Sequence, residues 1–289
     1  MFARYFIVPT IFRDTSQECI FDKELGFRPS FYSEYGTMKN QYNFKKMPGV
    51  TRILFMGDSV TCRGKIIHYL RRFLGKKKYE YWNAAVESYN LIQEIIYFFK
   101  FNRRLNPDIV IIFFHPNDFE EDAVIFDQGK KIIYYCPGGP IKFINKFWFE
   151  NSFLYRFLSC GFFRYNRNKK LLVSNSEKEL SLLKNYLFNK GIDFKVVILP
   201  ISQPYNEWQT EMKTNRRMAI KILDNLYIKY FDLLDVLSVA VNKNIVLAET
   251  PGDYWHPSED FSFMIAKYLY KKGLIDEYCA PQKMLPSQK

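Results

Sequence analysis

Histidine and cysteine are scarce in this chain, and their scarcity excludes several kinds of site. There are three histidines and five cysteines among 289 residues. His68, His115 and His256 lie far apart in the sequence and in no metal-ligand spacing. The cysteines form no closely spaced pairs, so the chain resembles neither a disulfide scaffold nor a zinc module. We therefore expect no metal ion and no other cofactor.

Nucleotide-binding and membrane-spanning patterns are missing as well. No Gly-x-Gly-x-x-Gly sequence and no phosphate-binding loop occurs. The apolar stretch 2–12 contains Arg4 and Pro9, is too short to span a membrane, and is followed by no small-residue cleavage site. For the chain as given, these absences favour a cytoplasmic location.

Acidic residues are few relative to basic ones, which gives a net charge of +12 and a pI of about 9.3. About half of this excess lies between residues 140 and 175, where Glu150 is accompanied by Lys142, Lys146, Arg156, Arg164, Arg167, Lys169 and Lys170. Such a segment suits an anionic glycan, a phospholipid surface or a nucleic acid, and charge alone does not choose among them. The chain lacks a nucleic-acid recognition motif, so we expect no nucleic acid partner.

Apolar runs alternate with amphipathic segments along most of the chain, as a parallel α/β sheet requires. The expected strands span residues 53–56, 79–86, 108–114, 194–199 and 231–237. The expected helices span residues 63–74, 91–105, 177–190, 211–230 and 258–272. This order predicts a three-layer α/β/α sandwich around a five-stranded, mostly parallel, flavodoxin-like sheet.

Two stretches depart from this alternation and set the predicted domain organisation. We expect an N-terminal extension at 1–48, a main domain at 49–275 and a C-terminal tail at 276–289. Residues 119–175 are too long for an ordinary loop and form an insertion. Its aromatic residues are Phe147, Trp148, Phe149, Phe153, Tyr155, Phe157, Phe162 and Phe163. We interpret the insertion as a cap over the active-site edge of the sheet, the alternative being a helical hairpin that packs its aromatics on the core.

Three residues of the main domain suggest nucleophilic catalysis. Gly57 allows a tight turn after the buried run 53–56 and brings Ser59 to the carboxyl end of that strand, ahead of a helix. Near the other end of the chain, Asp253 and His256 stand three residues apart. A serine hydroxyl becomes a strong nucleophile when an imidazole takes its proton and a carboxylate orients that imidazole.

These residues and their order resemble the SGNH or GDSL-type hydrolases. Gly57-Asp58-Ser59 is similar to the first block of that family, and Asp253-x-x-His256 to the last. The segment 83–88 resembles the second block, with Ser88 where the family usually has glycine. Asn117-Asp118 resembles the third block, although His115 replaces the glycine usually found two residues earlier.

The resemblance implies a role for each matching residue. Ser59, His256 and Asp253 would form the catalytic triad, and the oxyanion hole would comprise Ser59, Ser88 and the Asn117 side chain. We expect His115 to lie at the mouth of the site, where it is a candidate for contact with substrate. Cys62, one helical turn after the serine, is interpreted as a structural thiol.

The resemblance also implies an activity, a serine esterase that acts through an acyl-enzyme on a small-molecule or glycan ester. An O-acetyl group on a saccharide suits the aromatic and basic insertion. Two alternatives stay open at this point, an O-acyltransferase with the same triad and a non-catalytic glycan-binding protein of the same fold. The motifs specify acyl chemistry and leave the acceptor, the compartment and the oligomeric state undefined.

Overall fold

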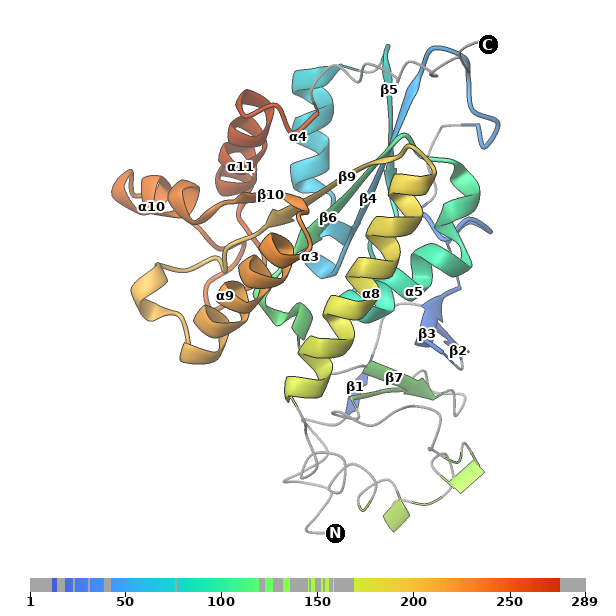
Figure 1. Cartoon of the computed structure of the whole chain (residues 1–289). Coiled ribbons are helices and arrows are strands. Elements are labelled where there is room, and N and C mark those ends of the chain that lie inside the picture. The colour runs from blue at the N-terminus through green and yellow to red at the C-terminus, as the bar shows by residue number, and fades with distance from the viewer. Residues whose placement is uncertain are drawn as a thin grey trace.

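Five parallel strands form the central sheet of the protein, for which we describe a computed structural model (Figure 1). It describes residues 12–14, 19–22, 24–30, 32–38, 43–75, 77–119, 123–126, 132–135, 145, 147–148, 152, 154–155, 158 and 169–275. The strands of the central sheet are β4 (Thr51–Gly57), β5 (Tyr79–Asn83), β6 (Ile109–Phe114), β9 (Asp193–Ile198) and β10 (Lys229–Asp232).

The strand order β10-β9-β6-β4-β5 positions the site. From β4 the chain passes to β5, which pairs with one edge of β4, and then crosses to β6, which pairs with the other edge of β4. The connection after β4 and the connection after β6 therefore run in opposite directions along the sheet, and open α/β sheets bind their ligands at the carboxyl edge where this change occurs. Because both neighbouring strands flank β4, the loops after all three strands meet beside its carboxyl end.

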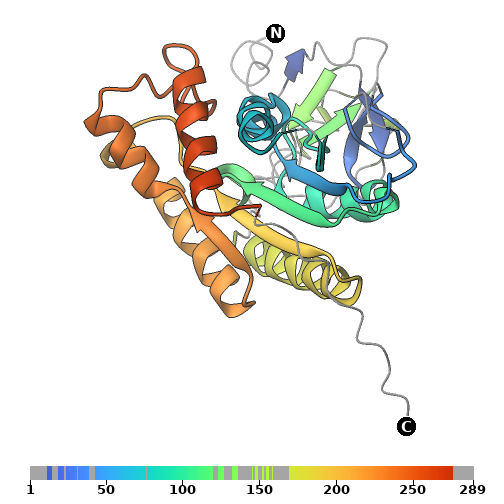
Figure 2. The ribbon, with the colours of Figure 1, turned by 90° about the horizontal axis from the view of Figure 1, so that it is seen from above.

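Helices cover both faces of this sheet (Figures 1 and 2). The side chains of β4 alternate between the faces, so Ile53 and Phe55 join one core cluster while Leu54 and Met56 join the other. The first cluster is completed by α4 (Lys65–Leu74), α10 (Leu234–Asn242) and α11 (Glu259–Lys271). The second is completed by α5 (Leu91–Lys100), α8 (Lys169–Asn189) and α9 (Thr210–Asn225). The predicted three-layer sandwich is thus confirmed, and every strand of its sheet is parallel.

Two predicted boundaries near the C-terminus are wrong. The strand expected at 231–237 is β10, which ends at Asp232, and Leu234 already begins α10. Asp232 accepts a hydrogen bond from the Leu234 amide and so assists the start of this helix. The helix expected at 211–230 ends at Asn225, because the chain turns at Tyr227 with a positive φ of 51° and then enters β10.

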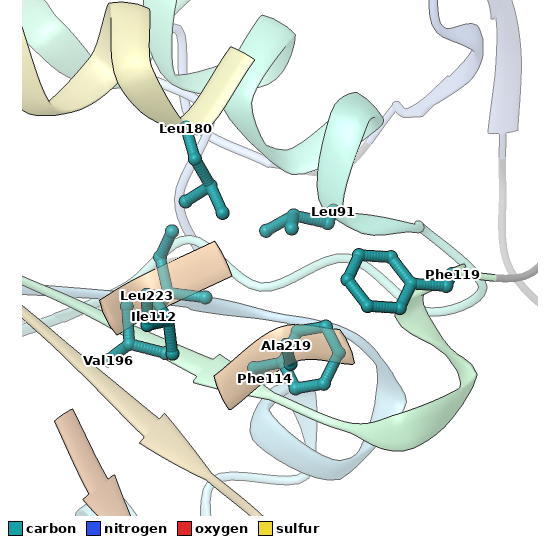
Figure 3. Close-up of a pocket in the computed structure, with 8 residues that line it drawn as sticks. All are labelled: Leu91, Ile112, Phe114, Phe119, Leu180, Val196, Ala219 and Leu223. Carbon is teal, nitrogen blue, oxygen red and sulfur yellow. The ribbon is translucent and has the colours of Figure 1, made fainter. Parts of the chain in front are cut away.

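Short elements lie at the carboxyl edge of the sheet and around the connections. They are α3 (Ser59–Cys62), η1 (Asn102–Leu105), η2 (Pro116–Phe119) and η4 (Tyr205–Glu207). The turn predicted at 115–118 is η2, and Phe119 anchors its end in the core. The Phe119 ring packs on Phe114 with centroids 5.0 Å apart, at a small apolar cavity that Leu91 and Leu180 also line (Figure 3).

The described parts of the N-terminal region pack against the main domain. β2 (Cys19–Asp22) and β3 (Gly26–Pro29) pair as an antiparallel hairpin, and Leu25 and Phe27 are buried against Tyr89 and Tyr97. The Gln93 side chain of α5 donates to the Leu25 carbonyl at 2.6 Å. A second small sheet joins β1 (Phe12–Asp14) to β7 (Ala123–Phe126) and β8 (Ile132–Tyr135), and so pairs the N-terminal region with the insertion.

Candidate active site

The turn after β4 presents Ser59 at the first position of α3. Gly57 has a φ of 152°, and an added Cβ there would lie 2.3 Å from the Thr61 hydroxyl oxygen, so the turn requires glycine. Asp58 caps the helix, because its Oδ1 accepts a hydrogen bond from the Val60 amide at 2.9 Å. The backbone at Ser59 is therefore held in place by the turn at Gly57 and by the Asp58 cap, at the carboxyl edge of the sheet.

The structure brings Ser59, His256 and Asp253 together in a hydrogen-bonded chain. The Ser59 Oγ atom lies 3.0 Å from His256 Nε2, and His256 Nδ1 lies 2.8 Å from Asp253 Oδ2. Ser59 and His256 are almost two hundred residues apart in sequence, so only the fold makes this contact. The geometry matches what a general base and its orienting carboxylate require.

Asp253 is held as an anion beside the imidazole. Its Oδ1 accepts hydrogen bonds from the backbone amides of Trp255 and His256 at 3.0 and 3.1 Å. Partial burial acts to raise the pKa of Asp253, but the hydrogen bonds from the His256 side chain and from these amides outweigh it and lower the pKa below its usual value. A carboxylate that remains ionised can keep the proton of the neutral imidazole on Nδ1, which leaves Nε2 free to accept the serine proton.

The loop that carries His256 is joined to the segment that follows Ser59. Glu249 forms ion pairs with Arg63 and Lys65, which follow α3 in the chain. Its backbone amide donates to the His256 carbonyl at 2.9 Å. On the other side, the Ser202 amide, beyond the end of β9, donates to the Tyr254 carbonyl at 2.8 Å. These contacts link the imidazole loop to two parts of the sheet edge.

The two loops predicted to supply oxyanion donors contact the turn that precedes Ser59. Ser88 has a positive φ of 65°, so its backbone adopts the left-handed conformation that favours glycine although the residue is serine. The loop before Ser88 is held to β4, since the Val86 amide donates to the Gly57 carbonyl at 3.0 Å. Asn117, half-buried in η2, directs its Nδ2 toward Asp58 Oδ2 at 3.4 Å.

His115 does not lie at the mouth of the site as predicted. Its ring is fully buried, and a side chain without exposed surface reaches substrate only if its loop moves. The ring contacts Trp255 edge-on, with centroids 5.6 Å apart, and its Nδ1 lies 2.6 Å from Asn117 Oδ1. His115 precedes a short η2 turn whose Asp118 accepts from the His115 amide at 2.7 Å, which draws this residue inward.

A buried acid that the sequence analysis did not single out lies close enough to Asp58 for their charges to interact. Glu94, in the first turn of α5, is 3% exposed, and neither of its carboxyl oxygens has a hydrogen-bond partner among the described residues. Burial raises the pKa of Glu94 well above its usual value, and the negative charge of Asp58 raises it further.

Cys62 is a buried thiol at the end of α3, as its interpretation required. The Tyr32 hydroxyl lies 3.5 Å from its Sγ and donates to the Ala85 carbonyl at 2.6 Å. Burial raises the pKa of the Cys62 thiol above its usual value, with the Tyr32 hydrogen bond acting in the opposite direction. A thiol that resists ionisation is a weak nucleophile, so this residue serves packing.

Most of the basic and aromatic insertion lies outside the described residues. This applies to its cations Lys142, Lys146, Arg156, Arg164 and Arg167, and to the tail 276–289. Phe147 and Trp148 are described, and they expose 64% and 54% of their surface. Within the described ranges no helix is long and apolar enough to cross a membrane, and no cluster of three or more candidate ligands could hold a metal ion.

Comparison with known proteins gives structural matches only. No protein-family model matches the chain, and no curated protein matches it in sequence. An acetylxylan esterase from Geobacillus stearothermophilus superposes with a TM-score of 0.52 at 13% identity, covering 78% of this chain and 97% of its own. A protein from Parabacteroides merdae described as a GDSL-like lipase gives a TM-score of 0.50 at 15% identity, covering 79% and 98%. The chain has the fold of the GDSL-type esterases.

A further structure of this fold is similar to the same extent. The acetyl xylan esterase AlAXEase superposes with a TM-score of 0.50 at 15% identity, covering 77% of this chain and 99% of its own. Because these proteins match over nearly their whole length, the GDSL fold accounts for most of the main domain of this chain.

Proposed function

We propose that the protein is a serine esterase whose substrate is an O-acetyl ester of a saccharide. The observation that carries this proposal is the hydrogen-bonded chain from Ser59 Oγ through the His256 imidazole to Asp253, with distances of 3.0 and 2.8 Å. A serine without a catalytic role is not expected to bond to an imidazole that a carboxylate also orients.

In the proposed reaction His256 Nε2 takes the Ser59 proton as the Oγ atom attacks the ester carbonyl. The imidazole becomes an imidazolium, which the Asp253 carboxylate stabilises, and the carbonyl oxygen becomes an oxyanion. The Asn117 side-chain amide and the backbone amides of Ser88 and Ser59 are the donors for this oxyanion. Its collapse expels the alcohol, which takes a proton from His256, and a water molecule then hydrolyses the acyl-enzyme with the same imidazole as base.

Two observations support a saccharide ester as the substrate. Two proteins of the same fold are acetylxylan esterases, and a serine-to-alanine form of the Geobacillus enzyme is described as a catalytic mutant. The exposed rings of Phe147 and Trp148 are of the kind on which sugar rings stack.

The substrate class can be tested with paired ester series. Acetylated xylo-oligosaccharides and p-nitrophenyl esters of rising acyl length are offered to the wild-type protein, and kcat/KM is compared across both series. We expect acetyl esters to be preferred and free acetate to be released from the oligosaccharide. A preference for long acyl chains would contradict the saccharide assignment, and acetylated product formed from an added sugar acceptor would identify a transferase.

A further inference from the structure

The Asn117 amide is held at both of its ends. Its Oδ1 lies 2.6 Å from His115 Nδ1, and its Nδ2 makes a long hydrogen bond of 3.4 Å to Asp58 Oδ2. An amide oxygen can only accept, so His115 Nδ1 is the donor in the first contact. A carboxylate can only accept, so the amide nitrogen faces Asp58 and its second hydrogen stays available. The two contacts therefore agree on one orientation of the amide.

The imidazole of His115 is suited to donate a hydrogen bond from Nδ1 to Asn117 Oδ1. Its ring is fully buried, and Nε2 has no hydrogen-bond partner in the described part of the chain. Burial lowers the pKa of His115, against the opposing influence of the Asp58 charge and the Asn117 contact, so the ring is neutral near pH 7. A neutral imidazole carries one proton, and Asn117 Oδ1 fixes that proton on Nδ1.

We propose that His115 is a positioning residue that holds the Asn117 amide with its nitrogen toward the oxyanion. This inference rests on the proposed esterase function. If the amide turned over, it would present its oxygen, an acceptor, to the negative charge that develops in the transition state. Glycine, usual at this place in the resembled family, has no side chain to make the contact. In this chain the orientation of the amide depends on a side chain two residues away.

Replacements that differ in hydrogen bonding separate this role from packing. His115→Phe keeps a ring and removes the donor, and His115→Leu is a second donor-free variant if the first fails to fold. We expect kcat for p-nitrophenyl acetate to fall about tenfold to a hundredfold, no more than the loss of a whole oxyanion donor would cost, with little change in KM. His115→Asn should restore most of kcat, because its Nδ2 lies near the place of the imidazole Nδ1. An unchanged kcat in the donor-free variants would overturn the proposal.

A double-mutant cycle tests whether His115 acts through Asn117. In an Asn117→Ala background the amide is gone, so His115→Phe should cause no further loss of kcat. Losses that multiply would show an independent effect on packing and would overturn the inference. Labelling by a fluorophosphonate probe distinguishes a failure of the proposed esterase function from a failure of the inference about His115. A wild-type protein that is not labelled at Ser59 would refute the esterase function and this inference together, whereas labelling with multiplying losses would refute the inference alone.

Discussion

Replacement of Glu94 by glutamine is expected to stabilise the protein at neutral pH and to have little effect in acid. The glutamine has the shape of the protonated acid but cannot ionise. Both carboxyl oxygens of Glu94 are buried without a hydrogen-bond partner in the described part of the structure, and burial raises the pKa of this residue. In the unfolded chain the same carboxyl has a pKa of about 4.3. The folded protein therefore retains a proton that the unfolded chain has already lost.

This difference fixes the sign and the size of the effect. Below the unfolded-state pKa both states are protonated, and the stability that Glu94 confers is fully present. As the pH rises toward the higher pKa of the folded state, the unfolded chain releases its proton, and the free energy of unfolding falls by up to about 1.4 kcal/mol per pH unit. The variant has no such proton. Its advantage over the wild type should therefore grow at about this rate and become constant once the pH passes the folded-state pKa of Glu94.

Urea unfolding followed by tryptophan fluorescence measures the difference at a series of pH values from about 5 to about 8. Glu207→Gln provides the matched control, because Glu207 is an exposed carboxylate in η4. We expect the control to show no growing advantage with pH. A difference between Glu94→Gln and wild type that stays constant over this range would refute the reasoning, since it would mean that Glu94 ionises alike in both states.

Three further substitutions or modifications test the site. Asp253→Asn should reduce kcat for p-nitrophenyl acetate by about 10³- to 10⁴-fold, because the amide would favour the wrong imidazole tautomer. A much smaller loss of kcat in steady-state kinetics would contradict the orienting role of Asp253. Gly57→Ala should lower the free energy of unfolding by about 1–3 kcal/mol through backbone strain, and unchanged urea unfolding would contradict the required turn. The Cys62 thiol should react with iodoacetamide only after denaturation, and mass spectrometry that finds it alkylated in the native protein would contradict its burial.

The sheet and the meeting of Ser59, His256 and Asp253 could be predicted because their signals are local. The strands β4, β6 and β9 each contain a short apolar run next to an amphipathic segment, and parallel strands of this kind have few alternative arrangements. Ser59 and His256 could be paired without a structure because each stands in a recognisable short block. The C-terminal end of the strand predicted at 231–237 was wrong because the apolar residues there fit a strand and the first turn of α10 equally well.

The contacts that the sequence did not reveal are made between distant segments. The burial of Leu25 and Phe27 on α5 joins residues that no periodic pattern relates. His115 was expected at the mouth of the site because it follows the strand at 108–114, yet its ring is buried against Trp255. Glu94 resembles any polar residue of an amphipathic helix until the packing of α5 on the sheet is known. Sequence patterns thus locate the chemistry, while packing decides how its supporting residues are held.

The most direct test of the account compares the wild type with Ser59→Ala in two assays, hydrolysis of p-nitrophenyl acetate and labelling by a fluorophosphonate probe. Ser238→Ala, which alters an exposed serine on α10, is the matched control. The account predicts that wild type and control hydrolyse the ester and are labelled, and that Ser59→Ala does neither. Equal hydrolysis and equal labelling of Ser59→Ala would contradict the assignment of Ser59 as the nucleophile.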